Sequence, residues 1–321
     1  MAQYPTSGYA SYVNYGYEAT YGTAVAGTRT FGHGVKITHT RKNNLERIYG
    51  LGDRNFSAKA TKQFEGTASV EFVMSNASFL RAVLGDVTDG GSGPYTHSYA
   101  ETNRIPSFTI CAGTELGTDD EVVTLKGCKV NTATITAVVN EVAKVRLECL
   151  YQNETLATSG IGSQVLEVES PFVFSEGAVK IGGSTIGNVQ SIELTINNSL
   201  ESLFGLGSRF KTAEVEKQRE YNVRMTIAFS DVSVLLEKFF GNSSGPATND
   251  VASAGTLDLT FNNGLSSTDE REIAFSFATL FFDTETLPKS VTDVLKEDVE
   301  GFANTCSVVW TNNTSVDDGS P

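Results

Sequence analysis

The sequence has few of the side chains on which catalytic and metal sites most often depend. Its only histidines, His33, His39 and His97, are separated in the chain, so they suggest no catalytic triad and no metal set. His33 lies between two glycines and predicts a turn, His39 falls in a strand-like run, and His97 in a polar loop. We therefore predict no catalytic, cofactor-binding or metal-binding residue, and a protein that is not an enzyme.

Cysteine and basic residues are also scarce. The four cysteines have no Cys-X-X-Cys spacing, which predicts small buried apolar residues in a reducing cytosol rather than zinc or redox chemistry: Cys111, Cys128, Cys149 and Cys306. Lys and Arg number 24 against 38 Asp and Glu, a net charge of −14. That balance excludes a surface that grips nucleic acid by neutralising phosphates.

Long apolar runs are absent as well. No segment approaches the roughly 20 apolar residues of a membrane-spanning helix, and no basic segment followed by an apolar stretch opens the chain. We expect a soluble, unsecreted protein with no membrane partner.

The residues that are abundant favour strands. Gly (30) and Phe (19) are frequent, Val, Thr and Ile recur, and Pro (7) is rare, which is typical of a mainly β protein. At 321 residues, 40% of them hydrophobic, the chain is long enough for two domains.

An internal repeat is the most informative feature. Leu45–Arg54 recurs as Leu200–Arg209, with six of ten positions identical. The same register pairs the alternating segment Ala68–Met74 with Val223–Phe229, which predicts a strand in each copy.

Each of these strands is followed by a helix signal. Ser75-Asn76 and Ser230-Asp231 are predicted N-caps, and Gly85 and Gly241 the stops. The residues that share one helical face in the two copies are Phe79, Leu80, Val83 and Leu84, and then Val232, Leu235, Leu236, Phe239 and Phe240. Each unit thus reads as strand, long loop, strand and short amphipathic helix.

Further strands are predicted by alternation after each helix. They are Ser107–Ala112, Glu121–Val130, Thr132–Val139 and Ala143–Tyr151 in the first copy, with a turn at Asn140-Glu141, and Leu257–Phe261, Glu272–Phe282 and Cys306–Thr311 in the second, with a short helix over Val291–Leu295.

The polar stretch Asn153–Ser163 before a strand signal at Gln164–Val168 predicts a domain boundary near residue 160, giving domains 1–160 and 161–321.

Six tyrosines crowd the first 21 residues without strand or helix period, which suits either an arm that docks on a neighbouring subunit or a disordered leader. Asn312–Pro321 is predicted to be a frayed polar tail.

Two other patterns favour loops over sites. Gly50-Leu51-Gly52 and Gly205-Leu206-Gly207 lack the third glycine, preceding strand and following helix of a nucleotide site. The acidic runs Asp119–Glu121 and Asp269-Glu270 indicate solvated surface, with a calcium or acid–base site as the alternative.

Several segments, in order along nearly the whole chain, resemble tail tube proteins of tailed bacterial and archaeal viruses: Tyr15–Val25, Pro106–Ile110, Lys126–Asn131 before a hairpin, and Pro171–Phe174 leading to Gln190–Asn198. The resemblance implies two tandem tail-tube-like β-sandwich or barrel domains, each with a short flanking helix. It further implies that the sheets of neighbours join around a lumen, and that a duplicated chain closes as a trimer with pseudo-sixfold symmetry whose rings stack into a tube in the virion tail.

By the same resemblance, the insertions Arg41–Gln63 and Asn197–Gln218 bridge stacked rings, and their mix of Gly and charge suits segments that order only on contact. Arg54 and Arg209 are expected to make charge-assisted contacts there; the alternative is ordinary solvated hairpin loops. The predicted assembly residues are Arg47, Gly50, Gly52, Arg54, Gly205, Gly207, Arg209 and Lys211.

Implied partners are copies of the chain itself, a tape measure protein, and tail terminator and tip proteins, with assembly in the host cytoplasm. Viral DNA would pass without specific binding, because carboxylates lining a lumen repel phosphate. Two other classes stay open: another β-rich virion subunit such as a sheath, fibre or decoration protein, and a carbohydrate-binding module or hydrolase on a β-sandwich.

Overall fold

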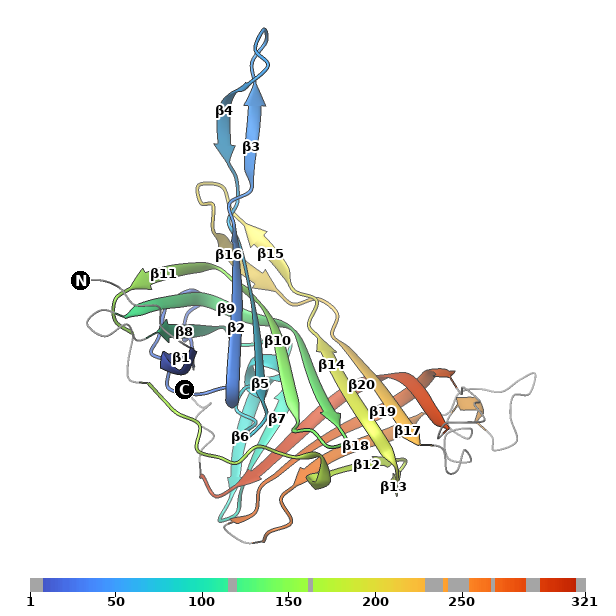
Figure 1. Cartoon of the computed structure of the whole chain (residues 1–321). Helices are drawn as coiled ribbons and strands as arrows, with labels where there is room; N and C mark the ends of the chain where they lie inside the picture. Colours follow the sequence, from blue (N-terminus) through green and yellow to red (C-terminus); the bar gives the residue numbers. More distant parts are fainter. Residues whose placement is uncertain are drawn as a thin grey trace.

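The structure, a computed structural model, describes residues 8–114, 120–160, 164–228, 239–241, 254–266, 269–286 and 295–315. The described chain is mainly β, as predicted, and its strand pairs are antiparallel (Figure 1).

The elements of the first half are η1 (Gly8–Ala10), β1 (Ser11–Tyr17), β2 (His33–Lys42), β3 (Leu45–Tyr49), β4 (Phe56–Thr61), β5 (Glu65–Val73), α1 (Leu80–Leu84), β6 (Gly85–Gly91), β7 (Tyr95–Glu101), β8 (Phe108–Thr114), β9 (Glu121–Val138), β10 (Lys144–Tyr151) and β11 (Asn153–Ala157).

The described elements of the second half are η2 (Phe174–Glu176), β12 (Gly177–Ile181), β13 (Ser184–Thr185), β14 (Val189–Asn197), β15 (Glu201–Phe204), β16 (Lys211–Val215), β17 (Glu220–Ala228), β18 (Gly255–Asn262), β19 (Glu272–Thr286) and β20 (Lys296–Asn312).

One long sheet runs through both halves in the order β13-β12-β18-β19-β20-β17-β14-β9-β10-β5-β2. The halves meet where β14 pairs with the end of β9, from Ser191 opposite Val138 to Asn197 opposite Thr132. We call this pairing the internal joint.

Each strand of the joint is apolar on one face and polar on the other. Ile192, Leu194 and Ile196 alternate with polar residues along β14 and are at most 3% exposed, and they belong to the core cluster that also contains Ala133 and Ile135 of β9. An antiparallel sheet with one face on the core and one face free has this alternation.

The same strand order and register occur in both halves. In the first, β2 pairs with β5 so that Lys36 lies opposite Glu71; in the second, β14 pairs with β17 so that Ser191 lies opposite Thr226. Each residue of the first pair precedes its counterpart by 155 residues, the spacing of the sequence repeat.

The two halves also share a register in strands whose sequences no longer match. Glu148 of β10 lies opposite Thr132 of β9, and Glu300 of β20 opposite Thr284 of β19, a constant spacing of 152 residues. Both pairings shift by one residue immediately beyond these positions, which leaves Asn131 and Asp283 as corresponding bulge residues.

Several boundaries differ from the sequence predictions. Glu121–Val130 and Thr132–Val139 form one strand, β9, bulged at Asn131, and Gln164–Val168 forms no strand. The β6–β7 hairpin was not predicted, and it places His97 in a strand rather than a loop. His97 is buried between Asp89 and Asn312, 2.6 Å and 3.0 Å from its ring nitrogens.

Helix α1 is shorter than predicted. It begins at Leu80, without a side-chain cap, while Asn76 accepts from the Ser78 amide in the turn before it. Gly85 ends it as expected, at a φ of 128°. The second predicted helix lies outside the described residues except for Phe239 and Phe240, which are helical, and residues 291–294 of the predicted short helix also lie outside them.

The N-terminal tyrosines do not form an arm between Ser11 and Tyr21. Ser11–Tyr17 is β1 and pairs with β8, and Tyr15 is fully buried and stacked 4.4 Å from Phe31 between ring centroids. Tyr15 thus belongs to the core of its own chain, and Tyr17, on the same strand, packs against that core.

Glu18 ties this segment to the sheet. Its buried carboxylate accepts four hydrogen bonds, each of 2.8 Å, from the amides of Gly22 and Gly127 and the hydroxyls of Ser107 and Thr109. A buried carboxylate is tolerated when donors saturate it in this way.

The segment between the halves is also held. Asn14 exchanges hydrogen bonds with the backbone of Val165, and Arg271 donates to Ser170 O at 2.6 Å. At the other end of the chain, Asn312 is buried as the last residue of β20 rather than part of a frayed tail; residues 316–321 lie outside the described residues.

We predict that Glu18→Ala lowers the free energy of unfolding by about 3 kcal/mol, because four buried donors lose their acceptor. Urea unfolding followed by tryptophan fluorescence measures this. Glu121→Ala, at the exposed start of β9, is the control and should change stability by less than about 0.5 kcal/mol. An equal effect of both variants would contradict the role of Glu18.

Candidate assembly surfaces

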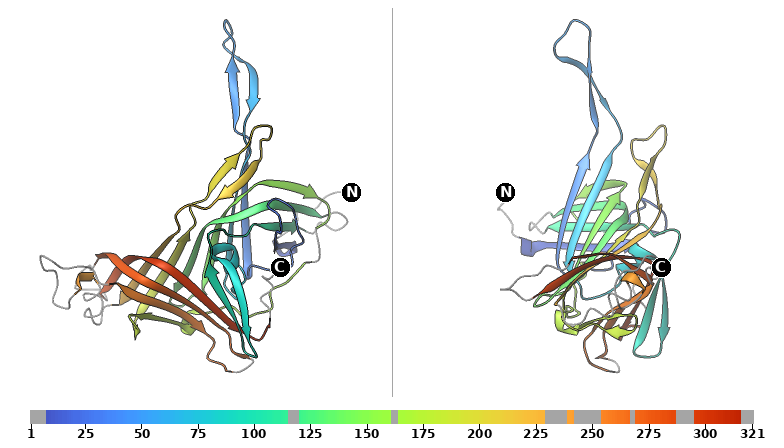
Figure 2. Two further views of the ribbon diagram at one scale, coloured as in Figure 1. Left: turned by 180° about the vertical axis from the view of Figure 1, so that it is seen from behind. Right: turned by 90° about the vertical axis from the view of Figure 1, so that its right-hand side faces the viewer.

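Two β-hairpins leave the long sheet on the same side. The β3–β4 and β15–β16 hairpins both project upward in Figure 1, and the turned view in Figure 2 shows the same arrangement. They replace the long loops predicted at Arg41–Gln63 and Asn197–Gln218, and they are ordered strand pairs within a single chain.

The hairpin tips have the same construction. Gly52 and Gly207 have φ values of 86° and 91°, which a glycine adopts without strain. The preceding Leu51 and Leu206 are both fully exposed. Two apolar side chains held at the tips of projecting hairpins are available for contact with another molecule.

The structure places the eight predicted assembly residues in three environments. Six are exposed, Arg209 is half-buried, and Lys211 is buried. The exposed ones are Arg47, Gly50, Gly52, Arg54, Gly205 and Gly207.

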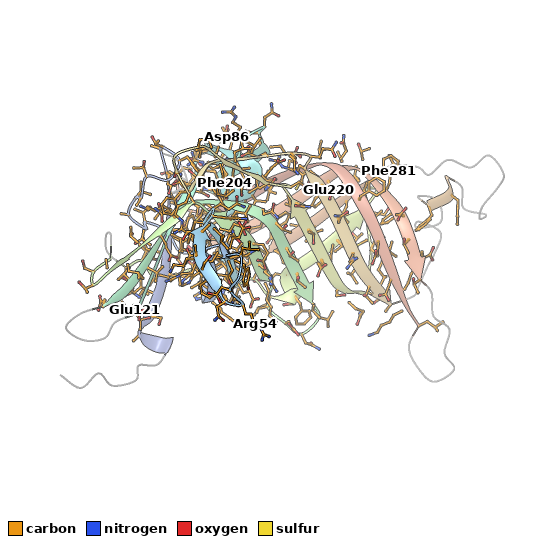
Figure 3. All side chains as sticks on the ribbon, turned by 90° about the horizontal axis from the view of Figure 1, so that it is seen from above. Arg54, Asp86, Glu121, Phe204, Glu220 and Phe281 are labelled. Atoms are coloured by element: carbon orange, nitrogen blue, oxygen red, sulfur yellow. The ribbon has the colours of Figure 1, made fainter. Side chains whose placement is uncertain are left out.

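The two arginines paired by the repeat differ. Arg54 is exposed at the first tip (Figure 3). Arg209 turns back to the first hairpin, where its guanidinium donates to Asn43 Oδ1 at 2.6 Å and lies 5.9 Å from the centroid of Phe64. Arg209 thus holds the tip of the second hairpin against the base of the first.

Lys211 belongs to an internal ionic cluster. Its Nζ lies 2.6 Å from Glu214 Oε1, and both residues are at most 3% exposed. Lys129 approaches the same place, 2.6 Å from Glu216 and 3.1 Å from the backbone oxygen of Glu214. Burial raises the pKa of Glu214 despite the two lysines. This cluster anchors the second hairpin and leaves Lys211 no free surface.

The polar face of the long sheet carries charges of both signs in cross-strand rows. Lys36, Glu71 and Arg146 lie opposite one another on β2, β5 and β10. Lys36 Nζ and Arg146 Nη1 each lie 3.4 Å from a carboxylate oxygen of Glu71. Across the joint, Arg224 lies 3.1 Å from Glu300. The face is mixed rather than lined by carboxylates alone.

Several strand edges in the described part of the sheet have no partner strand, among them the outer edges of β1, β6, β11 and β13, and two further edges matter here. The outer edge of β2 is one, because β2 pairs only with β5. The other is Thr284–Thr286, where β19 pairs with β20 on one side but extends past β18, whose pairing ends at Leu280. We call these the β2 edge and the β19 edge.

An acidic pair lies beside the β19 edge. Glu297 is 2% exposed, and one of its carboxylate oxygens has no hydrogen-bond partner among the described residues. Burial, followed by the hydrogen bond and charge of Glu285, raises the pKa of Glu297 to about 7.

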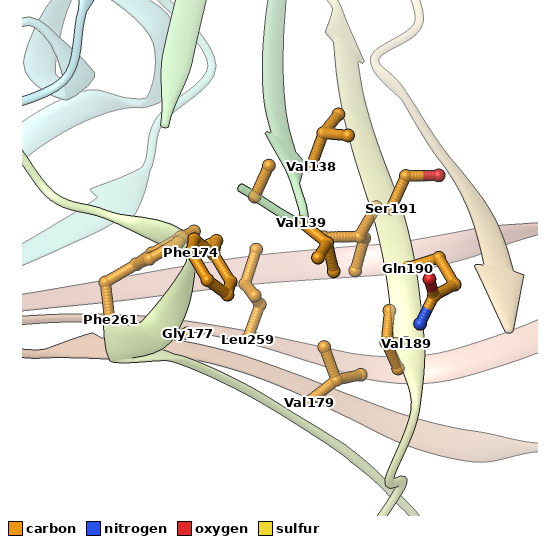
Figure 4. Close-up of a pocket in the computed structure, with 12 residues that line it drawn as sticks. Val138, Val139, Phe174, Gly177, Val179, Val189, Gln190, Ser191, Leu259 and Phe261 are labelled. Atoms are coloured by element: carbon orange, nitrogen blue, oxygen red, sulfur yellow. The ribbon is translucent and has the colours of Figure 1, made fainter. Parts of the chain in front are cut away.

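The hollows among the described residues differ in size, and the larger ones, of about 470 Å³, lie beside Arg271 and over the polar face at Arg224. The apolar pocket in Figure 4, between Phe174, Val179, Val189 and Leu259, has a volume of about 60 Å³, below the roughly 300–1,000 Å³ of ligand sites. Among the described residues no group of His, Cys, Asp and Glu could hold a metal, and no helix there is long and apolar enough to cross a membrane. The four cysteines are buried and free, as the sequence predicts for their burial.

Sequence reasoning missed the two free edges and the acidic pair. Their recognition requires the strand order, and Glu285 and Glu297 meet only because β19 and β20 pair in one register. The first hairpin strand has little sequence signal, because Leu45–Tyr49 does not alternate between apolar and polar residues and is exposed throughout.

We predict that Glu297→Gln stabilises the protein at pH 8 but not at pH 5. Because the folded-state pKa lies above the ordinary 4.5, the folded chain binds this proton more tightly, so its contribution is present below about pH 4.5 and lost as the pH rises through about 7. The amide removes that loss, and the melting temperature at pH 8 should rise by about 2–4 °C, the effect of about 1 kcal/mol in a domain of roughly 150–250 residues. Equal shifts at both pH values would contradict the assignment.

Two comparisons with known proteins bear on these surfaces. A family model described as phage tail tube protein matches residues 8–293, which is most of the chain. A search of curated proteins found no match.

Proposed function

Because the chain belongs to the phage tail tube protein family, and is in that sense a structural tail protein, we propose that it is a tandem duplication of one tube-forming unit, with three copies closing into a ring. The proposed units correspond to residues 1–160 and 161–321. Rings then stack into the tail tube of the virion.

One observation carries this proposal: two sets of strands with the same order, register and bulge lie side by side and are joined edge to edge. Within the chain, β9 of the first unit pairs with β14 of the second unit. The same kind of strand pairing can join a unit of one chain to a unit of the next chain. Closing such a series into a ring pairs the free strand edges, which would otherwise invite aggregation.

The two faces of the sheet support the orientation of the ring. The apolar face packs on α1 and the β1–β8 layer and is covered. The polar face is free, so we assign it to the lumen. Its alternating Lys, Arg, Asp and Glu side chains pair with one another, as Arg224 does with Glu300, which leaves no continuous basic stripe to hold DNA in transit.

The projecting hairpins support stacking. They leave the sheet on one side only, and their tips present Leu51, Leu206 and Arg54. Insertion of these tips into the next ring would bury the two leucines, each contributing about 1.5–3 kcal/mol.

A tube of this kind implies further partners. We propose a tape measure protein inside the growing tube, tail terminator and tip proteins at its ends, and assembly in the host cytoplasm. Viral DNA would pass through the lumen during delivery without a specific binding site.

We predict that the purified chain forms rings and tubes. Negative-stain electron microscopy should show annular end views with threefold symmetry, and native mass spectrometry should give a trimer as the smallest closed species. A monomer that persists at high concentration would contradict the proposal.

We predict different effects for the two repeat-related arginines. Arg54→Ala should shorten tubes and leave the melting temperature unchanged, since Arg54 makes its contacts outside its own chain. Arg209→Ala should lower the free energy of unfolding by about 1–2 kcal/mol, because it removes a charged hydrogen bond within the chain. Tube length by microscopy and thermal melts of both variants separate the two roles. Full-length tubes from Arg54→Ala would remove this residue from the stacking contact.

A further inference from the structure

The internal joint serves as a template for contacts the chain can make with another copy. At this joint Thr195 of β14 lies opposite Thr134 of β9, with Ile196 opposite Ala133 and Asn197 opposite Thr132. Immediately beyond the strand, the Asn198 and Leu200 amides donate at 2.8 Å to the backbone and side-chain oxygens of the bulge residue Asn131.

Both sides of this joint have counterparts elsewhere in the chain. The 155-residue spacing relates Thr195 to Thr40 and Asn197 to Lys42 on β2, and the 152-residue spacing relates Thr134 to Thr286 and Thr132 to Thr284 on β19. These counterparts are the β2 edge and the β19 edge, and neither has a partner strand among the described residues.

We propose that the β2 edge of one copy pairs with the β19 edge of a second copy in the register of the internal joint, an inference that rests on the proposed ring. Thr40 then lies opposite Thr286, Arg41 opposite Glu285 and Lys42 opposite Thr284. The partner is a second copy of this chain, because the edge it must match is a repeat of the edge already matched inside the chain.

The charges of the two edges are complementary in this register. The β2 edge carries Arg41 and Lys42, and the β19 edge carries Asp283 and Glu285. Arg41, whose Nε lies 2.9 Å from Glu154 in its own chain, is placed between two carboxylates. Its guanidinium has donors enough for both, and it brings a positive charge to the acidic pair of Glu285 and Glu297.

The bulge provides a second matching feature. Asn43 corresponds to Asn198, and Asp283 to Asn131. Asp283 is exposed and has a side-chain oxygen where Asn131 has the one that accepts from Leu200. In the copy that supplies the β2 edge, the amide of Leu45 is the corresponding donor, so the contact ends with a charge-assisted hydrogen bond at the base of the first hairpin.

The two edges cannot meet within one chain. Six strands of the long sheet separate β2 from β19, about 34 Å along the sheet at the usual strand spacing. Figure 3 shows Phe281 of β19 far from the hairpin of Arg54, which rises from β2. An interface between unlike edges is head-to-tail and generates a ring when the rotation closes.

Cysteine pairs test the register. Directly opposite residues on antiparallel strands have Cα atoms about 4.5–5.5 Å apart, within the range for a disulfide. A chain carrying Thr40→Cys and Thr286→Cys should give covalent trimers after mild oxidation, read on a non-reducing gel. A mixture of the two single variants should give covalent dimers and no trimers.

Two further cysteine pairs are matched controls. Thr134→Cys with Thr195→Cys, the equivalent pair inside the chain, should form an intramolecular disulfide and establish that this geometry is oxidisable. Thr38→Cys with Thr286→Cys, on the same face but two residues out of register, should give less than about a tenth of the cross-linking, because the Cα separation exceeds the limit. The four native cysteines are buried.

A charge exchange tests the same contact without oxidation. Arg41→Glu should reduce the trimer fraction at least about tenfold at low salt, and Arg41→Glu combined with Glu285→Arg should restore it. Both positions are at the surface or half-buried, and far-ultraviolet circular dichroism checks that the fold persists.

The outcomes separate this inference from the proposed function. Rings that form normally but cross-link equally or better through the out-of-register pair would overturn the register and leave the ring in place. A monomer with no cross-linking, although the control pair inside the chain oxidises, would overturn the ring and the register together.

Discussion

Unpaired backbone amides and carbonyls at strand edges are the constraint on which this structure depends. A sheet built from one repeated unit has, at every boundary, an edge that must be paired, covered or left to aggregate. The chain pairs one such boundary internally, between β9 and β14, through seven residue pairs. The equivalent edges on β2 and β19 have no partner strand among the described residues, and the proposed ring would pair them.

The position of the polar and apolar faces follows from the same constraint. Because side chains alternate along a strand, a shift of one residue at any boundary would expose Ile196 and bury the charged rows. The register of the internal joint is therefore fixed by burial on one face, while the ion pairs on the other face are exposed and each contribute little. Buried polar groups appear where they hold segments in place, such as Glu18 directly after β1 and the pair of Lys211 and Glu214 within β16.

Much of the fold could be predicted from the sequence, because alternation and the repeat are local signals. The strands around Val70 and Met225, the turn at Asn140 and the stop at Gly85 all follow from such signals. The repeat also located the two tips through Gly52 and Gly207. Predictions were wrong where tertiary pairing decides the outcome. Tyr15 joins the core because β1 pairs with β8, and Lys211 is buried beside Glu214 of its own strand, with Lys129 approaching from the distant strand β9. The partner of each strand edge cannot be read from one strand alone, since it depends on the order of all the strands between.

The two hairpins of one chain are alike in their tips but not in their bodies. The strands β3 and β4 have five and six residues, and β15 and β16 have four and five. In the proposed ring, taller and shorter projections would alternate around the rim. A following ring would then find three equivalent orientations instead of six, so fusing two units into one polypeptide would also limit the angles at which successive layers of the tail can be laid down.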